Sequence, residues 1–141
     1  MALWKKIIIA ILIVILLLII GIALFIRSLP DLCGNEILTE VNSPNGKLKA
    51  ITYERNCGAT TAFSTHVAIL PRNSNLEKDG KTILAADTAR GKAPAGRGGG
   101  PEVRIHWLSD TSLEVQYHQL AHVRLSKKTS MGVQVFYCTF Q

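Results

Sequence analysis

The stretch that decides the architecture is Ile7–Ile26, which reads IIIAILIVILLLIIGIALFI. These 20 residues include no charged and no polar side chain. Because a helix rises about 1.5 Å per residue, a run of this length extends about 30 Å, the thickness of the hydrocarbon core of a bilayer. Such a helix has no polar face for water, and in lipid it satisfies its own backbone hydrogen bonds. The run therefore predicts a transmembrane helix.

The flanks of this run predict that it is an uncleaved anchor with its N-terminus in the cytoplasm. Lys5 and Lys6 precede the run and Arg27 follows it, so the excess of positive charge lies on the N-terminal side. No small-x-small cleavage pattern follows, and Asp31 and Leu32 occupy positions where a lipoprotein signal has small residues. We expect an anchor over residues 1–27, a tether over 28–35 and an exported domain over 36–141.

The exported part is long enough for one domain. About 115 residues follow the anchor, which suffices for a single modest core. Of the formal net charge of +6, three positive charges flank the apolar run, which leaves +3 outside the membrane. No basic run is interleaved with aromatic residues, so the composition argues against nucleic acid as a partner.

Alternating apolar and polar residues predict that this domain is mainly β. Predicted strands cover residues 36–42, 47–55, 63–70, 82–87, 102–108, 112–117 and 133–140. No stretch after the anchor shows convincing helical periodicity, although residues 118–125 could form one or two turns. We expect a small antiparallel β-sandwich or curved sheet. In the hairpin around Asp110, pairing Trp107 with Val115 brings the apolar residues to one face and places His106 diagonal to His118.

The first predicted hairpin also predicts a disulfide. Ser43-Pro44-Asn45-Gly46 suits a type I turn followed by a left-handed glycine, which makes a three-residue loop with Ser43 opposite Lys47. In that register Cys33 faces Cys57, at a separation that a disulfide can bridge. Cys138 would then stay free. Two unpaired buried thiols at Cys33 and Cys57 remain the alternative.

Two groups of residues suggest ligand sites, each beside a simpler explanation. The glycine-rich segment 90–101, RGKAPAGRGGGP, is expected to be an exposed, mobile loop, in which Arg90, Lys92 and Arg97 are a weak anion-binding candidate. It matches no phosphate-loop motif and no helix follows it. His106, His118 and His122 are weak metal candidates, although exposed polar histidines explain them equally well. We predict no cofactor.

The segment 55–65, RNCGATTAFST, is the candidate recognition loop. It lies between two predicted strands, carries four hydroxyl side chains and would be held at its start by the Cys57 disulfide. Rigid loops on β scaffolds commonly bind partners. We therefore expect Thr60, Thr61 and Ser64 to contact a protein partner. A nucleophilic site is not expected, because Ser64, Thr65 and His66 are strand neighbours that point to alternate faces.

Several stretches resemble a family of small, uncharacterised bacterial envelope proteins that begin with a signal or lipoprotein segment. These are Cys33, SPNGKLKA (43–50), ERNCGATTAFST (54–65), GGGPEVRIHWLSD (98–110) and LEVQYH (113–118). The resemblance spans residues 33–137, and its recurring cysteines fit a Cys33–Cys57 bridge. It implies an envelope location, here the bacterial inner membrane with the C-terminal domain periplasmic, and no known activity.

Taken together, these features predict a membrane-anchored, extracytoplasmic module that binds an unknown envelope protein without catalysis. One alternative is an accessory subunit or immunity-type inhibitor of a membrane complex, in which the helix itself contacts the partner. The other alternative is a metal-binding or hydrolytic envelope protein. Replacing the anchor by an unrelated helix distinguishes the first two, and metal analysis addresses the third.

Overall fold

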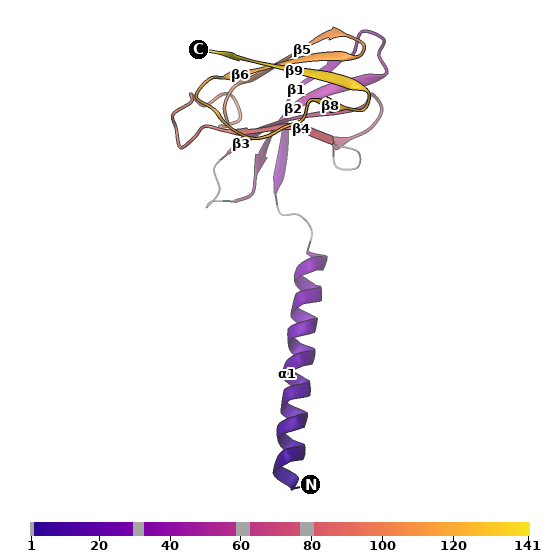
Figure 1. Ribbon diagram of the computed structural model, residues 1–141, viewed down its shortest axis with the longest axis vertical. Helices are drawn as coiled ribbons and strands as arrows, with labels where there is room; N and C mark the ends of the chain where they lie inside the picture. The colour runs from indigo at the N-terminus through magenta and orange to yellow at the C-terminus, as the bar shows by residue number, and fades with distance from the viewer. Residues whose placement is uncertain (1, 30–32, 59–62, 77–80) are drawn as a thin grey trace. The chain divides into compact units, whose positions relative to one another are not determined.

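The computed structural model describes residues 2–29, 33–58, 63–76 and 81–141, and it divides the chain into two units, Met1–Leu32 and Cys33–Gln141. The first unit is the helix α1 (Leu3–Ser28), drawn in indigo in Figure 1. All its side chains are exposed, and its length and composition are sufficient to cross a membrane. An N-terminal apolar helix of this kind is a signal anchor or a signal peptide.

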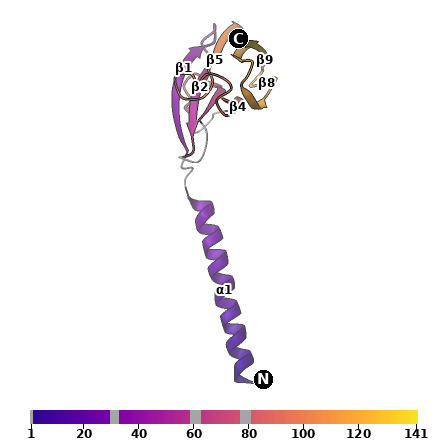
Figure 2. The same ribbon diagram turned by 90° about the vertical axis from the view of Figure 1, so that its left-hand side faces the viewer.

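The second unit is a pair of β-sheets, as the sequence pattern predicts. The five-stranded sheet is antiparallel and has the order β1 (Gly34–Asn42), β2 (Leu48–Asn56), β3 (Ser64–Pro71), β4 (Lys81–Asp87) and β7 (His122–Ser126). The four-stranded sheet has the order β5 (Val103–Ser109), β6 (Ser112–His118), β9 (Val133–Phe140) and β8 (Thr129–Ser130). Figure 2 shows the two sheets as separate layers. One feature departs from the prediction, because β6 and β9 run parallel.

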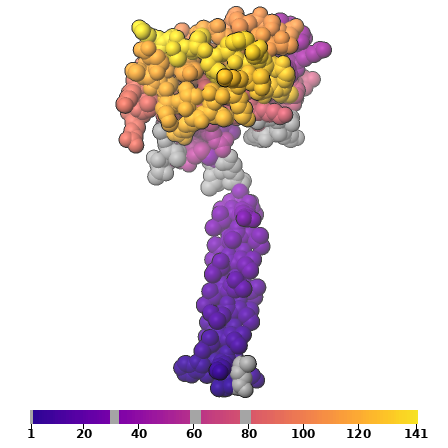
Figure 3. Space-filling view, in the orientation of Figure 1, coloured from indigo at the N-terminus to yellow at the C-terminus, as the bar shows by residue number. Residues whose placement is uncertain are grey.

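The hydrophobic core lies between the two sheets. Ile69 and Leu84 of the five-stranded sheet and Leu113 and Val115 of the four-stranded sheet are fully buried in it. Trp107 closes one side, where its Nε1 donates a hydrogen bond of 3.0 Å to the carbonyl oxygen of Val41. The outer face of the four-stranded sheet is exposed and carries both polar side chains and the exposed Phe136. Orange and yellow atoms fill the front of the domain in Figure 3.

The β1–β2 hairpin forms the predicted disulfide, but through a different register at its turn. Ser43 faces Leu48 rather than Lys47, because its N–H donates to the Leu48 carbonyl at 2.9 Å and the loop holds one more residue than expected. A β-bulge between Ile37 and Thr39 removes this offset, so that Gly34 pairs with Asn56. The longer turn and the bulge shift the register in opposite directions, so the pairing at the open end of the hairpin is the predicted one. Cys33 and Cys57 are joined there with a Cα–Cα distance of 4.0 Å.

The predicted register of the β5–β6 hairpin is wrong by two residues. Trp107 pairs with Leu113, and Ile105 pairs with Val115. A shift of two keeps every side chain on the same face, so the alternation pattern cannot distinguish the two registers. The observed register adds a buried Trp107–Leu113 pair, and it places His106 opposite Glu114, away from His118. Residues 118–121 form a turn, after which β7 begins.

The glycine-rich segment is exposed over residues 90–92, as predicted, but it is packed at its C-terminal end, where Gly100 and Pro101 are buried, which corrects that part of the prediction. Its C-terminal half packs directly against the start of β3, where the Thr65 hydroxyl donates a buried hydrogen bond of 2.7 Å to the Pro101 carbonyl oxygen. A Cβ added at Gly100 would lie 2.5 Å from Thr65 Oγ1, and one added at Gly98 would lie 2.9 Å from Glu54 Cβ. The glycines are therefore required by a close approach of backbone to sheet.

Candidate functional site

One row of paired residues crosses the whole five-stranded sheet at the end where β1 begins. Asn35 pairs with Arg55, Arg55 with Ser64, Ser64 with Asp87, and Asp87 with His122. We call these five residues the polar row. Directly paired residues point to the same face of a sheet, here the outer face. The row therefore gathers polar side chains from five strands that are far apart in the sequence.

Asp87 is the centre of the hydrogen-bond network at one end of this row. Its side chain is 8% exposed, and its carboxylate accepts a hydrogen bond from Arg124 Nε at 2.8 Å and lies 2.6 Å from Arg124 Nη2 in an ion pair. The backbone N–H of Ala89 donates at 2.8 Å, and His122 Nδ1 lies at 3.3 Å. Burial alone would raise the pKa of Asp87, but these hydrogen bonds and the charge of Arg124 outweigh it and hold the pKa below its usual value.

A hollow of about 560 Å³ opens beside Asp87. Two cationic side chains of the β4–β5 connection, Arg90 and Lys92, line it together with Asp87, His122 and Arg124. Two of the three anion-binding candidates from the sequence, Arg90 and Lys92, therefore lie together at this hollow. Arg97 lies elsewhere, in a cleft of about 320 Å³ between β1 and β5.

Ser64 and His66 form a second polar group on the same face. Residues two apart on a strand share a face, and Ser64 Oγ lies 2.8 Å from His66 Nε2. The His66 ring packs against Tyr53, with 5.2 Å between the ring centroids. Burial, with the charges of Arg55 and Arg124, lowers the pKa of His66 to about 4. The imidazole is therefore neutral at physiological pH.

The Ser64–His66 pair lacks two properties of a nucleophilic site. Ser64 is only 8% exposed, and no hydrogen bond joins the His66 ring to a carboxylate within the described part of the chain. A base with a pKa of about 4 is also a weak proton acceptor at neutral pH. Adjacency in the sequence does not indicate this pair, because neighbouring strand residues point to opposite faces, whereas the two-residue period of a strand does indicate it.

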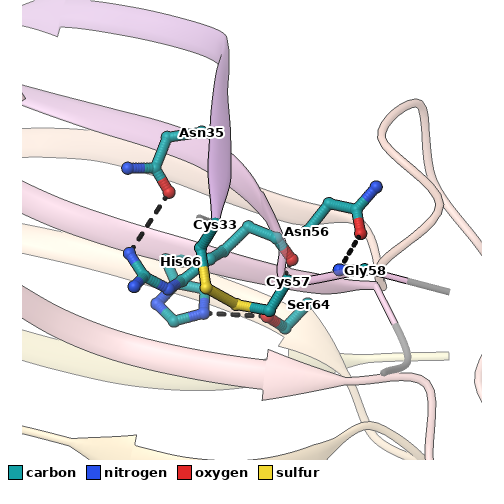
Figure 4. The surroundings of a disulfide bond; sticks show 8 residues. Cys33, Asn35, Asn56, Cys57, Gly58, Ser64 and His66 are labelled. Carbon is teal, nitrogen blue, oxygen red and sulfur yellow. Dashed lines mark hydrogen bonds between the residues drawn. A yellow bond between two sulfur atoms is a disulfide. The ribbon is translucent and has the colours of Figure 1, made fainter. Parts of the chain in front are cut away.

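The disulfide lies at the same end of the sheet as the polar row. Figure 4 shows Cys33 and Cys57 beside Ser64 and His66, with Asn35 and Asn56 on the adjoining strands. The predicted pairing is confirmed, and Cys138 is free and exposed on β9 as expected. A disulfide fits a domain outside the cytoplasm.

The remaining predicted site residues are the three hydroxyl residues of the candidate recognition loop and the three histidines. Thr60 and Thr61 lie outside the described residues, and Ser64 is buried in β3 rather than displayed by a loop. His106 and His118 lie on the outer face of the four-stranded sheet, opposite Glu114 and Phe140, whereas His122 belongs to the other sheet. Among the described residues, no group of three or more His, Cys, Asp or Glu side chains could hold a metal ion.

The structure thus defines a class of protein, a disulfide-bonded β-sandwich that follows one apolar helix. Within this class the chain belongs to a family of unknown function, DUF5412, whose family model matches residues 3–84. The match covers α1, β1, β2 and β3 and extends into β4, and so includes the disulfide and Ser64. No curated protein and no solved structure matches the chain.

Proposed function

We propose that this chain is a membrane-anchored interaction module whose β-sandwich captures an envelope protein through the surface around the polar row. In this proposal α1 remains uncleaved in the bacterial inner membrane, its N-terminus lies in the cytoplasm, and residues 33–141 lie outside. The excess of positive charge before the helix supports this orientation, because positively charged flanks are retained in the cytoplasm. The disulfide supports an oxidising compartment for the domain.

The observation that carries the proposal is the convergence at one end of the five-stranded sheet. Exposed polar side chains of β7 and the β4–β5 connection surround the buried carboxylate of Asp87. At the same end of the sheet, on its other edge, the Cys33–Cys57 bridge joins the ends of β1 and β2. Rigid strand ends lose little conformational entropy when a partner binds. This surface extends the contact region expected from the sequence, in which Ser64 belongs to the polar row and Thr60 and Thr61 lie outside the described residues.

The experiment that tests the proposal is site-specific photocrosslinking of the full chain in cells. A photoreactive amino acid is placed at Asn35 or His122, and at the exposed Gln134 or Thr139 of β9 as matched controls. We expect discrete protein adducts from the first pair only, and their persistence when α1 is replaced by an unrelated apolar helix. Adducts from all four positions would refute the assignment of the surface. Loss of the adducts on helix replacement would favour an accessory subunit that binds through its membrane segment.

A further inference from the structure

The hollow beside Asp87 carries an excess of positive charge. Three cationic side chains, Arg90, Lys92 and Arg124, line it with one carboxylate, Asp87, and with His122. The formal charges of the two arginines, the lysine and the aspartate sum to +2 at the hollow. Asp87 is paired with Arg124, so the uncompensated charge among the groups that line the hollow is that of Arg90 and Lys92.

Arg124 is held in a fixed orientation at this hollow. Its Nε donates to Oδ2 of Asp87 at 2.8 Å, and its Nη2 faces the same oxygen at 2.6 Å. A guanidinium group has five N–H donors, so three remain for a ligand. Because the Asp87 side chain is 8% exposed and is itself anchored by the backbone N–H of Ala89, the orientation of Arg124 is set before any ligand arrives. Such preorganisation lowers the entropy lost on binding.

The loop that brings Arg90 and Lys92 to the hollow is closed and strained. The N–H of Ala93 donates to the Thr88 carbonyl oxygen at 3.0 Å, and the Ala93 side chain is buried. Between these ends Ala89 and Arg90 have φ values of 52° and 61°. Non-glycine residues adopt this left-handed region at an energetic cost, and such strain is concentrated at functional sites.

We propose that this hollow binds a phosphate group. A phosphate dianion matches the net charge of +2 and offers several oxygen acceptors for the planar donors of Arg124 and Arg90. The phosphate can belong to a lipid headgroup or to a free phosphorylated molecule. This inference rests on the proposed function, because it names the chemistry that part of the interaction surface recognises.

The test is a titration of the full-length protein, in nanodiscs of a zwitterionic phospholipid, with inorganic phosphate, followed by calorimetry. The site variant carries Arg90→Gln and Lys92→Gln. The matched control carries Arg97→Gln and Lys127→Gln, which remove the same charge from exposed positions outside the hollow. Losing two charge-assisted contacts should weaken binding at least tenfold in the site variant, whereas the control should change less than twofold.

Equal weakening in the two variants would overturn the proposal, because it would show non-specific attraction to positive charge. Absence of binding to the wild-type protein at 10 mM phosphate would also overturn it, because this concentration is well above the dissociation constant expected of a specific site. A second titration, in nanodiscs that contain an anionic phospholipid, separates the two sources. Weaker phosphate binding there indicates that a lipid headgroup occupies the hollow, and unchanged binding indicates a free phosphorylated ligand. If the wild-type protein binds phosphate in this titration but gives no protein adducts in the photocrosslinking experiment, the proposed function is rejected and the phosphate site is retained.

Discussion

Replacing Gly100 by alanine tests how tightly the glycine-rich segment is packed against the sheet. The added Cβ would lie 2.5 Å from Thr65 Oγ1, 2.8 Å from the Thr65 nitrogen and 2.9 Å from the Ser64 carbonyl carbon. Two of these atoms belong to the backbone of β3, a strand paired on both sides, so the segment must move instead of the strand. Gly100 does not have a positive φ, and the expected cost is therefore steric.

The magnitude follows from the contacts that this movement breaks. Forcing one extra carbon into a packed interior costs about 1–3 kcal/mol. Displacing residues 100 and 101 also breaks the buried hydrogen bond from Thr65 Oγ1 to the Pro101 carbonyl oxygen, which costs about 1 kcal/mol more. We therefore expect the free energy of unfolding to fall by about 3 kcal/mol.

Gly91→Ala is the matched control within the same connection. Gly91 has a φ of +86° and no atom within 4 Å of an added Cβ, so its substitution introduces backbone strain without a steric clash. It should cost about 1 kcal/mol. Both variants are made with Trp4→Phe in the full chain, so that Trp107, the other of the two tryptophans, reports urea unfolding in detergent by its fluorescence. If Gly100→Ala costs no more than Gly91→Ala, the packing argument is refuted.

Three further predictions use different measurements. Replacing Cys33 and Cys57 together by alanine should lower the free energy of unfolding in urea by about 3 kcal/mol, because the bridge closes a loop with a sequence separation of 24; an unchanged urea midpoint would contradict this. Because the pKa of His66 is lowered in the folded protein, the unfolded chain takes up a proton at a higher pH than the folded one. The contribution of His66 to stability is therefore fully present above its ordinary pKa of 6.5 and decreases as the pH falls towards about 4. His66→Gln should remove about 1–2 kcal/mol of this decrease, after allowance for the partial exposure of the ring, and identical pH profiles of the two proteins would disprove the assignment. A membrane-impermeant maleimide should label the exposed Cys138 in intact spheroplasts, whereas labelling only after lysis would show that the proposed orientation is wrong.

Features that depend on nearby residues could be predicted from the sequence. The apolar run predicts α1, and alternation predicts most of the strands, because both patterns are read within one segment. The Cys33–Cys57 bridge was predicted correctly even though the turn is longer than expected, because the bulge beside Leu38 restores the register. The predicted register of β5 with β6 was wrong by two residues, because the alternation of apolar and polar residues is the same in registers that differ by two.

Features that depend on pairing between distant strands could not be predicted. The polar row requires the registers of β2 with β3, β3 with β4 and β4 with β7, and none of these is specified by a short turn. Composition was misleading for segment 90–101, because glycine permits both a mobile loop and a close approach to a sheet. Only the position of Thr65 beneath Gly100 distinguishes these two structures.

The parallel pairing of β6 with β9 constrains the order in which the domain can be assembled as it leaves the ribosome. β9 follows every other described strand in the chain, yet it lies inside the four-stranded sheet and contributes Val133 and Val135 to the core. The β1–β2 hairpin is synthesised first and contains both bridging cysteines within a local loop. Oxidation of the thiols can therefore precede closure of the sandwich, whereas burial of Leu113 and Val115 must wait until synthesis has passed Phe140. During that interval the inner face of the five-stranded sheet is uncovered, and such transiently exposed apolar surface favours aggregation until the last strand is in place.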